Sequence, residues 1–308
     1  MATAGTGKDK NARGAALVVA GSRQTPGAVM LAAESAIRAG AGKVQVITVG
    51  SVAAQVAVAL PEALVQGVPE TANGEIDVQA ADTVLDLAEG ADAVLFGPGV
   101  MQLPAVAALL EKVLPGLEGN VVLDAFALSY LSEDAGRLQE LPARYVLTPN
   151  EEELLLTLGV DPTEMGEETR VAAGRLAALS GAVVYSGGAT TWTASSEGQL
   201  WRDDGGGPGL GVSGSGDVKS GIILGLLARG CDAAQAAVWG AHLHARRAPG
   251  LAGRAGRLPG PGHPRRSAAD PHRAGGIAVK AGPPSPGPGR PDRAGPALRH
   301  GVQRPRGR

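Results

Sequence analysis

Short apolar runs alternate with amphipathic stretches along most of this chain, and that alternation limits the possible folds more than any other feature. Residues 17–19 are expected to form a strand, residues 26–39 a helix closed by Gly40, and residues 44–49 the next strand. The same order then repeats several times. It predicts βαβ units, in which helices join parallel strands and cover both faces of one sheet.

The later elements continue this order. Further strands are expected at residues 93–96, 121–124, 145–148 and 182–185, and further helices at residues 103–114, 151–158, 164–179, 217–228 and 233–245. Residues 191–194 and 199–202 flank a four-residue polar turn and predict an antiparallel hairpin at the sheet edge. We therefore expect one α/β domain over residues 15–245, with a mostly parallel central sheet and an edge hairpin.

The composition changes abruptly at residue 246. Residues 246–308 contain 13 Gly and 12 Pro, no aromatic residue, and 13 Arg and one Lys against two Asp, a net charge of +12 that leaves −14 for residues 1–245. Such a segment buries too little apolar surface to offset its ordering entropy, so disorder is expected. The segment could be a plain basic tail, a basic tether for nucleic acid or membrane, or an out-of-frame translation, which fits the abrupt change in composition best. Residues 1–14 are expected to be a flexible leader.

Composition also argues against several functional classes. The single cysteine, Cys231, can form no intramolecular disulfide, and no Cys/His cluster has the spacing of a zinc site. No apolar run approaches the ~20 residues of a membrane helix. All eight aromatic residues precede residue 240, so the aromatic surfaces that stack on exposed bases are missing. We expect a cytoplasmic protein with neither a nucleic-acid nor a membrane partner.

The strongest local signal is a glycine-rich turn, Gly211-Val212-Ser213-Gly214-Ser215-Gly216-Asp217-Val218, that opens an apolar helix. Glycines let backbone N–H groups approach an anion, and a helix N-terminus adds partial positive charge, so a phosphate can bind there. Asp217 would lie in the first helical turn, able to take a proton from an incoming hydroxyl. The alternative is a flexible cap with an acidic residue that the helix dipole favours.

Two further turns, Gly97-Pro98-Gly99 and Thr148-Pro149-Asn150, follow predicted strands. In open parallel sheets ligands bind beyond the carboxyl ends of strands, so these turns and Gly187-Gly188 should converge at one end of the sheet. Each could also be a plain turn. Asn150 and Glu153 have N-cap and N3 spacing, and for Glu153 we favour a capping box over catalysis.

Two other features are interpreted as structural. His242 and His244 are two residues apart, point to different sides of a helix and form a poor metal pair. Cys231 follows the helix-ending Gly230 and has no neighbouring base, so we expect it to be a small apolar side chain.

Taken in order, eight segments resemble the ADP-dependent NAD(P)H-hydrate dehydratases, the carbohydrate-kinase-like domain of the ribokinase superfamily. The resemblance covers residues 15–245 and implies a ribokinase-like three-layer α/β/α domain. The segments are Gly21-Ser22-Arg23-Gln24-Thr25-Pro26-Gly27-Ala28, Arg38-Ala39-Gly40-Ala41-Gly42, Pro61-Glu62, Gly97-Pro98-Gly99, Leu147-Thr148-Pro149, Ala189-Thr190-Thr191-Trp192, Pro208-Gly209-Leu210-Gly211 and Ser213-Gly214-Ser215-Gly216-Asp217-Val218.

The resemblance implies a metabolite-repair enzyme. ADP, with ATP as a possible substitute, phosphorylates the hydroxyl of hydrated NADH or NADPH (NADHX or NADPHX), and loss of phosphate restores the reduced dinucleotide. It also implies a requirement for Mg²⁺ and a homotetramer. By position it assigns Asp217 as the catalytic base and implies no protein ligand for a metal. The substrate would contact Ala28, Gly99, Asn150 and Asp217, and the nucleotide would contact Gly187, Gly188, Ala189, Thr190, Thr191, Gly214, Ser215 and Gly216.

The chain departs from the family pattern at several positions. Gly187 stands where the family usually has a lysine, Glu151 and Glu152 add negative charge, Phe126 interrupts a run of small residues, and Lys219-Ser220 replaces the usual Leu-Ala. The family's closing helices after His244 are also absent. These departures keep two alternatives open: a kinase of the same superfamily acting on a small alcohol or vitamin precursor, and a catalytically impaired nucleotide-binding protein.

Overall fold

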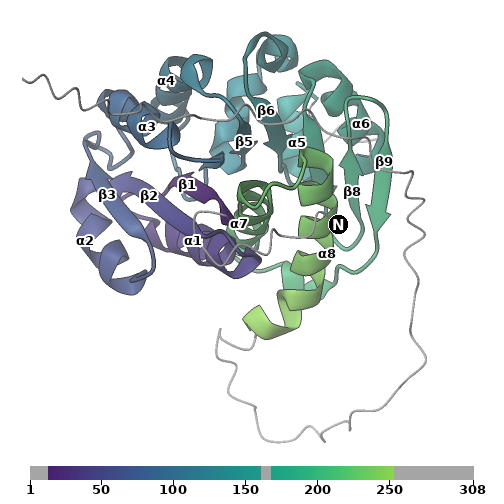
Figure 1. Cartoon of the computed structure of the whole chain (residues 1–308). Coiled ribbons are helices and arrows are strands. Elements are labelled where there is room, and N and C mark those ends of the chain that lie inside the picture. The colour runs from purple at the N-terminus through teal and green to yellow at the C-terminus, as the bar shows by residue number, and fades with distance from the viewer. Residues whose placement is uncertain (1–12, 161–167, 253–308) are drawn as a thin grey trace, which may run out of the picture. The chain divides into compact units, whose positions relative to one another are not determined.

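A nine-stranded sheet forms the centre of the computed structural model, which describes residues 13–160 and 168–252 (Figure 1). The strands lie in the order β3-β2-β1-β4-β5-β6-β7-β8-β9. Their bounds are β1 Ala15–Val19, β2 Lys43–Val49, β3 Leu64–Val68, β4 Ala93–Phe96, β5 Asn120–Leu123, β6 Arg144–Leu147, β7 Val183–Gly187, β8 Thr191–Ala194 and β9 Leu200–Asp203.

Strands β1 to β7 pair in parallel, and β8 and β9 add an antiparallel hairpin at one edge. All five residues of β1 are buried, as expected for a parallel strand that is covered on both faces. Strand order reverses between β1 and β4, which are neighbours in space with β2 and β3 on one side and β5 to β9 on the other. The predicted mostly parallel sheet with an edge hairpin is confirmed.

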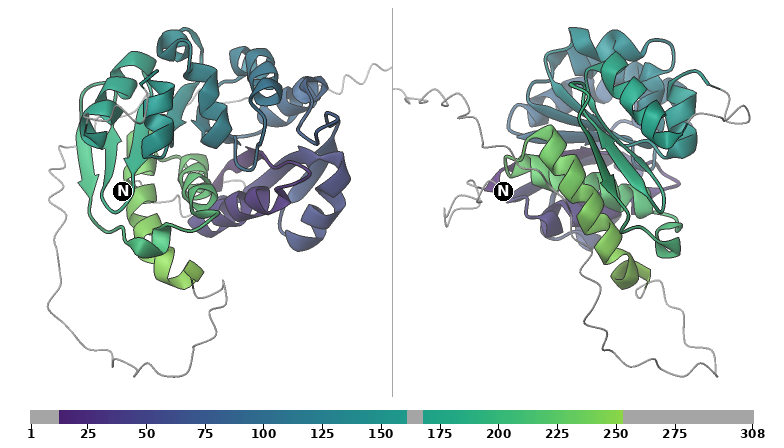
Figure 2. Two further views of the ribbon diagram at one scale, coloured as in Figure 1. Left: turned by 180° about the vertical axis from the view of Figure 1, so that it is seen from behind. Right: turned by 90° about the vertical axis from the view of Figure 1, so that its right-hand side faces the viewer.

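Helices cover both faces of this sheet (Figure 2). Two separate apolar cores result, one under each helical layer. On one face lie α1 (Pro26–Ala39), α2 (Gly50–Ala59), α7 (Ser215–Ala228) and α8 (Ala233–Ala252); on the other lie α3 (Ala81–Ala88), α4 (Leu103–Val113), α5 (Glu151–Thr157), α6 (Thr169–Ser180) and the 3₁₀ segment η4 (Ala125–Leu131).

Two glycines bring α1 and α7 unusually close. A Cβ atom at Gly221 would lie 2.2 Å from the carbonyl oxygen of Ala32, and one at Gly225 would lie 2.5 Å from that of Ala36. Only glycine fits at such contacts, because a side chain at either position would push the two helices apart. The N-terminal turns of both helices are thereby held over the same end of the sheet. Gly40 ends α1 in the left-handed conformation, as predicted.

The structure also contains elements that the sequence pattern does not predict, α2, β3 and α3. Only Val56 is buried along α2, so the helix lacks a clear amphipathic stripe. Helix α8 continues to Ala252, which corrects its predicted end at residue 245. The predicted helix at residues 164–179 begins at Thr169, residues 161–167 being outside the described part. Most of the expected leader and tail, residues 1–12 and 253–308, also lie outside it.

Candidate functional site

The turn after β4 meets the loop after β1 where the strand order reverses. The N–H of Gly21 donates to the carbonyl oxygen of Pro98 at 2.7 Å, and the hydroxyl of Thr25 donates to that of Gly99. Gly99 has φ of +69°, and a Cβ there would lie 2.6 Å from the Cβ of Ala28. The structure therefore brings Ala28 and Gly99 into contact at the position where open α/β sheets bind ligands.

Acidic and polar side chains gather after the next strands. Asp124 follows β5 and is 4% exposed, and the hydroxyl of Thr148, after β6, donates to its Oδ1 at 2.6 Å. Ala125 has φ of +47°, which is rare for a residue with a side chain and is typical of strained backbone at functional sites. A Cβ at Gly97 would lie 1.8 Å from the carbonyl oxygen of Asp124. The turn after β4 is thus packed directly against the backbone of Asp124.

Asp217 lies in the first turn of α7, as predicted. The pKa of Asp217 is raised to about 6, first by burial and then by the neighbouring Asp124, while Lys219 lowers it. Its Oδ2 is 3.8 Å from the place that a Cβ at Gly214 would occupy, and Gly214 has φ of +86° at the N-cap. A carboxylate with this pKa is ionised at neutral pH and still basic enough to accept a proton, which is what a general base requires.

The predicted capping box at the start of α5 is confirmed. Asn150 Oδ1 accepts the N–H of Glu153 at 2.8 Å, and the Glu153 carboxylate accepts the N–H of Asn150 at 2.9 Å. Burial raises the pKa of Glu153, the N–H of Asn150 lowers it, and Asp124 and Lys219 then act in opposite directions. The capping box fixes Asn150 beyond the carboxyl end of β6, at the same end of the sheet as Asp124.

The loop between β7 and β8 forms a further part of the candidate site. Gly187 has φ of +130°, and a Cβ there would lie 2.3 Å from the carbonyl oxygen of Thr190, so this backbone admits no side chain. The Thr190 hydroxyl donates to Asp204 at 3.0 Å, and a Cβ at Gly206 would lie 2.5 Å from the carbonyl oxygen of Ala189. The predicted nucleotide loop is therefore held closed by the glycine-rich segment after β9.

Helix α8 contacts both β9 and α7. His244 Nε2 lies 2.9 Å from Ser215 Oγ, and His242 Nδ1 lies 3.2 Å from Asp203 Oδ2. The two histidines contact different elements, as their spacing predicts. Burial lowers the pKa of His244 to about 4, with a smaller contribution from Lys219, so its imidazole is neutral at physiological pH. Ser215, a predicted nucleotide contact, is thereby tied to a buried neutral histidine.

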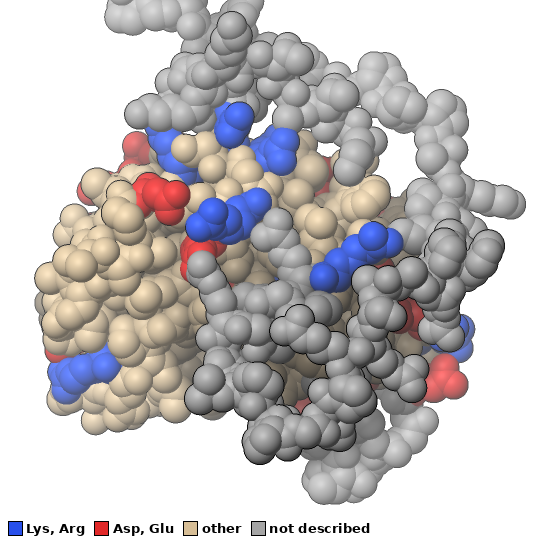
Figure 3. All heavy atoms as spheres, turned by 90° about the horizontal axis from the view of Figure 1, so that it is seen from below, with Lys and Arg blue, Asp and Glu red and all other residues tan. Residues whose placement is uncertain are grey.

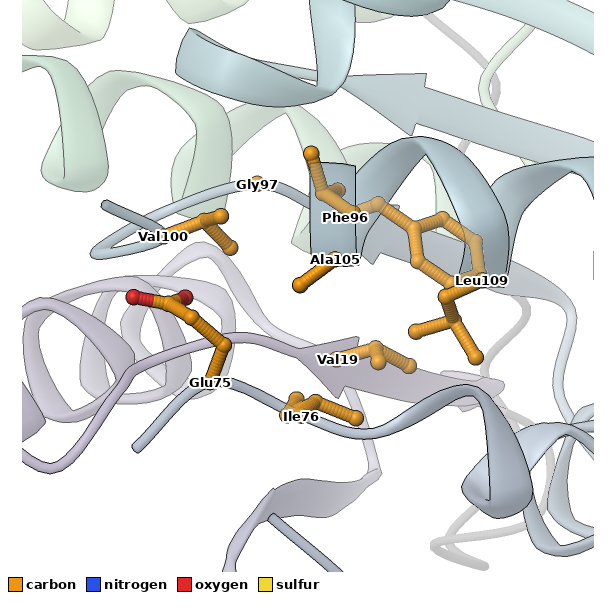
Figure 4. A pocket seen from close by; sticks show the side chains of 9 residues that line it. Val19, Glu75, Ile76, Phe96, Gly97, Val100, Ala105 and Leu109 are labelled. Atoms are coloured by element: carbon orange, nitrogen blue, oxygen red, sulfur yellow. The ribbon is translucent and has the colours of Figure 1, made fainter. Parts of the chain in front are cut away.

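A small apolar pocket, lined in part by Gly97, lies on the face of the sheet that α4 covers, opposite the face that α7 covers (Figure 4). Val19, Phe96 and Leu109 line it, and the carboxylate of Glu75 is at one end. Glu75 is 2% exposed, burial raises its pKa, and the N–H of Met101 donates to both carboxylate oxygens at 3.3 Å. The pocket has no contact with Asp217 among its lining residues, so we do not assign it to the site.

The three predicted turns do converge. Strands β4, β6 and β7 belong to the same parallel set, so the turns that follow their carboxyl ends lie at one end of the sheet. Asp124 and Lys219 also belong to this site, although the sequence analysis did not assign them to it. Asp124 closes a predicted strand, and the rule that ligands bind beyond strand ends could have identified it. The contact of Lys219 depends on tertiary packing and leaves no local signal.

In the described ranges, residues 13–160 and 168–252, none of the helices is long and apolar enough to cross a bilayer. Within the same ranges, His, Cys, Asp and Glu side chains form no group of three or more that could hold a metal ion. On the face shown in Figure 3, basic and acidic side chains lie interspersed among uncharged residues.

Comparison with known proteins adds independent information. A family model described as NAD(P)H-hydrate dehydratase matches residues 16–260. An ADP-dependent (S)-NAD(P)H-hydrate dehydratase of Xanthomonas campestris pv. campestris is 44% identical over 82% of this chain and 85% of its own length. The bifunctional NAD(P)H-hydrate repair enzyme of Moorella thermoacetica is 35% identical over 76% of this chain, which spans only 44% of that longer protein.

A solved structure agrees with these relatives. The ADP/ATP-dependent NAD(P)H-hydrate dehydratase of Bacillus subtilis, co-crystallised with ATP and Mg²⁺, superposes with a TM-score of 0.68 at 29% identity, over 80% of this chain and 84% of that chain. The two chains therefore share the same α/β fold, a mostly parallel sheet with helices on both faces.

Proposed function

We infer the function of this chain from the family to which it belongs, the NAD(P)H-hydrate dehydratases. It is an ADP-dependent enzyme that dehydrates hydrated NADH and NADPH back to the reduced dinucleotides. The observation that supports this best is Asp217, a partly buried carboxylate with a pKa of about 6 at the N-terminus of α7, beside a turn that can hold phosphate.

The reaction has two stages in this proposal. The hydroxyl of the hydrated nicotinamide ring attacks the terminal phosphorus of ADP, its proton passes to Asp217, and AMP leaves with the electrons of the broken P–O bond. The phosphate then leaves the ring with the C–O electrons, and loss of a ring proton restores the double bond. The first stage is phosphoryl transfer, in which positioning and charge stabilisation supply most of the rate enhancement.

The site residues divide between the two ligands. Three residues, Ala28, Gly99 and Asn150, would contact the hydrated dinucleotide. They lie beyond the carboxyl ends of the strands, on either side of Asp124. The backbone N–H groups at Gly214 and Gly216, together with Ser215, would receive the phosphates at the helix N-terminus. The closed loop from Gly187 through Gly188 and Ala189 to Thr190 and Thr191 would hold the rest of the nucleotide.

Mg²⁺ would enter bound to the nucleotide rather than to a protein cage. Mg²⁺ commonly keeps several of its waters and binds through substrate phosphates. ATP is an alternative phosphoryl donor. A cytoplasmic location without nucleic-acid or membrane partners, which the composition favours, and a homotetramer, which the family resemblance implies, complete the proposal.

A product analysis tests this function and separates it from its rivals. With NADHX, ADP and Mg²⁺, the dehydratase releases NADH, AMP and orthophosphate in equal amounts. A small-alcohol kinase would accumulate a phosphorylated product without orthophosphate, and an impaired protein would bind ADP without any turnover. The closed backbone at Gly187, which leaves no room for a cationic side chain, is the observation that keeps the impaired protein as the second candidate.

A further inference from the structure

Lys219 is the one buried lysine in the part of the chain that the structure describes. It is 8% exposed, whereas Lys43 and Lys112 are exposed. Its Nζ donates to the carbonyl oxygen of Thr148 at 2.6 Å and lies 5.1 Å from the centroid of the Tyr185 ring. Both of these partners are neutral. An ammonium group removed from water needs negative charge nearby, because its desolvation costs several kcal/mol.

Carboxylates on neighbouring parts of the chain supply that charge. Asp124 accepts the hydroxyl of the same Thr148 whose carbonyl binds Lys219, and Asp217 and Glu153 lie in the first turns of α7 and α5. Each of the pKa values of Asp217 and Glu153 is raised by burial and by Asp124 and lowered by Lys219. Without the ammonium group, these carboxylates would only repel one another.

The other two groups that face Lys219 carry no charge at neutral pH. His244 comes from α8, and its pKa is lowered to about 4 by burial first and by Lys219 second. The ring of Tyr185 comes from β7. Of the described groups packed against the first turn of α7, Lys219 is thus the cation that acts on Asp217.

We propose that Lys219 is a positioning residue of the reaction: anchored on Thr148, its ammonium group keeps Asp217 ionised and ready to accept a proton in spite of Asp124 and Glu153. The bond to Thr148 also ties the first turns of α7 to the end of β6, so that the charge has a fixed place. This inference rests on the proposed function, in which Asp217 takes the proton of the substrate hydroxyl.

The pH dependence of kcat tests it. Lys219→Met keeps the length of the side chain and removes the charge, and loss of a close opposite charge raises a carboxyl pKa by about one unit or more. The acid limb of the profile should therefore move from about pH 6 to about pH 7. The variant would be about fivefold slower than wild type at pH 6 and nearly equal to it at pH 8. Lys219→Arg, which keeps the charge, should retain the wild-type limb.

Lys112→Met is the matched control, because it removes an exposed lysine from α4. It should leave the profile unchanged. If Lys219→Met lowers only the melting temperature and keeps its acid limb at pH 6, Lys219 is merely a structural tether and the proposal is wrong. Lys219→Gln provides a second uncharged variant if the methionine protein does not fold.

A spectroscopic titration separates this proposal from the function itself. The carboxyl ¹³C resonance of Asp217, assigned by its loss in Asp217→Asn, reports protonation without any substrate. A wild type that lacks turnover would refute the dehydratase assignment, and the resonance would still decide the role of Lys219. A midpoint about one pH unit higher in Lys219→Met supports that role, and an unchanged midpoint overturns it.

Discussion

Replacing Asp217 by asparagine should make the protein slower and more stable at the same time. The amide keeps the size of the side chain but can neither accept the substrate proton nor carry charge. Loss of a general base typically lowers the rate by about 10²–10⁴-fold, or roughly 3–5 kcal/mol of transition-state stabilisation. ADP affinity should be retained or should increase, because a negative charge near the phosphates is gone.

The gain in stability follows from the pKa of Asp217. The shift from 3.8 to about 6 corresponds to about 3 kcal/mol, which solvent screening of this partly exposed side chain reduces to about 1–2 kcal/mol. Because the folded pKa is raised, protonation stabilises the fold fully below about pH 3.8, and this stabilisation is lost as the pH rises through about 6. Above pH 7 the wild type therefore carries the full destabilisation, and the neutral variant does not.

Thermal unfolding at two pH values, beside turnover, measures both effects. At pH 7.5 the melting temperature of Asp217→Asn should exceed that of wild type by about 2–8 °C, and the difference should fall to about half at pH 5. If Asp217 is only a favoured acidic residue of the first turn of α7, asparagine is an equally good cap, and turnover should not change. Unaltered turnover in this variant would refute the catalytic assignment.

Three further predictions concern the rest of the chain. Gly99→Ala should raise the KM for NADHX at least about tenfold in steady-state kinetics and leave ADP affinity unchanged, because the new Cβ would lie 2.6 Å from that of Ala28 at a φ of +69°; an unchanged KM would remove Gly99 from the substrate site. Asn150→Ala should lower stability by about 1 kcal/mol in denaturant unfolding through loss of the N-cap, whereas Asn150→Asp should not; equal stability of the two variants would contradict this. A chain ended after Ala252 should bind ADP in calorimetry as the full chain does, because a segment so rich in Pro and Gly supplies little packed surface; a large loss of affinity would show that the tail completes the fold.

Much of the architecture could be predicted because buried parallel strands are continuous apolar runs. The predicted strand at residues 93–96 coincides with β4, and the helix over residues 26–39 coincides with α1. Helix α2 and strand β3 were missed because neither shows a clear period: α2 buries only Val56, and β3 is an edge strand with a glycine. The end of α8 was misplaced because the change in composition at residue 246 was taken as the end of the fold.

The site was predictable to the extent that its residues follow strands or open helices. The glycine turns and Asp217 could be identified from such positions, and the capping box from its spacing. Lys219 could be recognised only as a departure from the family, because its burial and its bond to Thr148 depend on how α7 packs over the sheet. The contact between His244 and Ser215 likewise joins two helices and has no signature in either.

The central claim is tested most directly by the recovery of reduced nicotinamide absorbance when the purified chain is mixed with NADHX and Mg²⁺. The account predicts recovery that requires added ADP, or ATP in its place, and that falls by about 10²–10⁴-fold in Asp217→Asn. The absence of any nucleotide-dependent recovery in a wild type that binds ADP would contradict it and would identify the chain as an inactive nucleotide-binding protein.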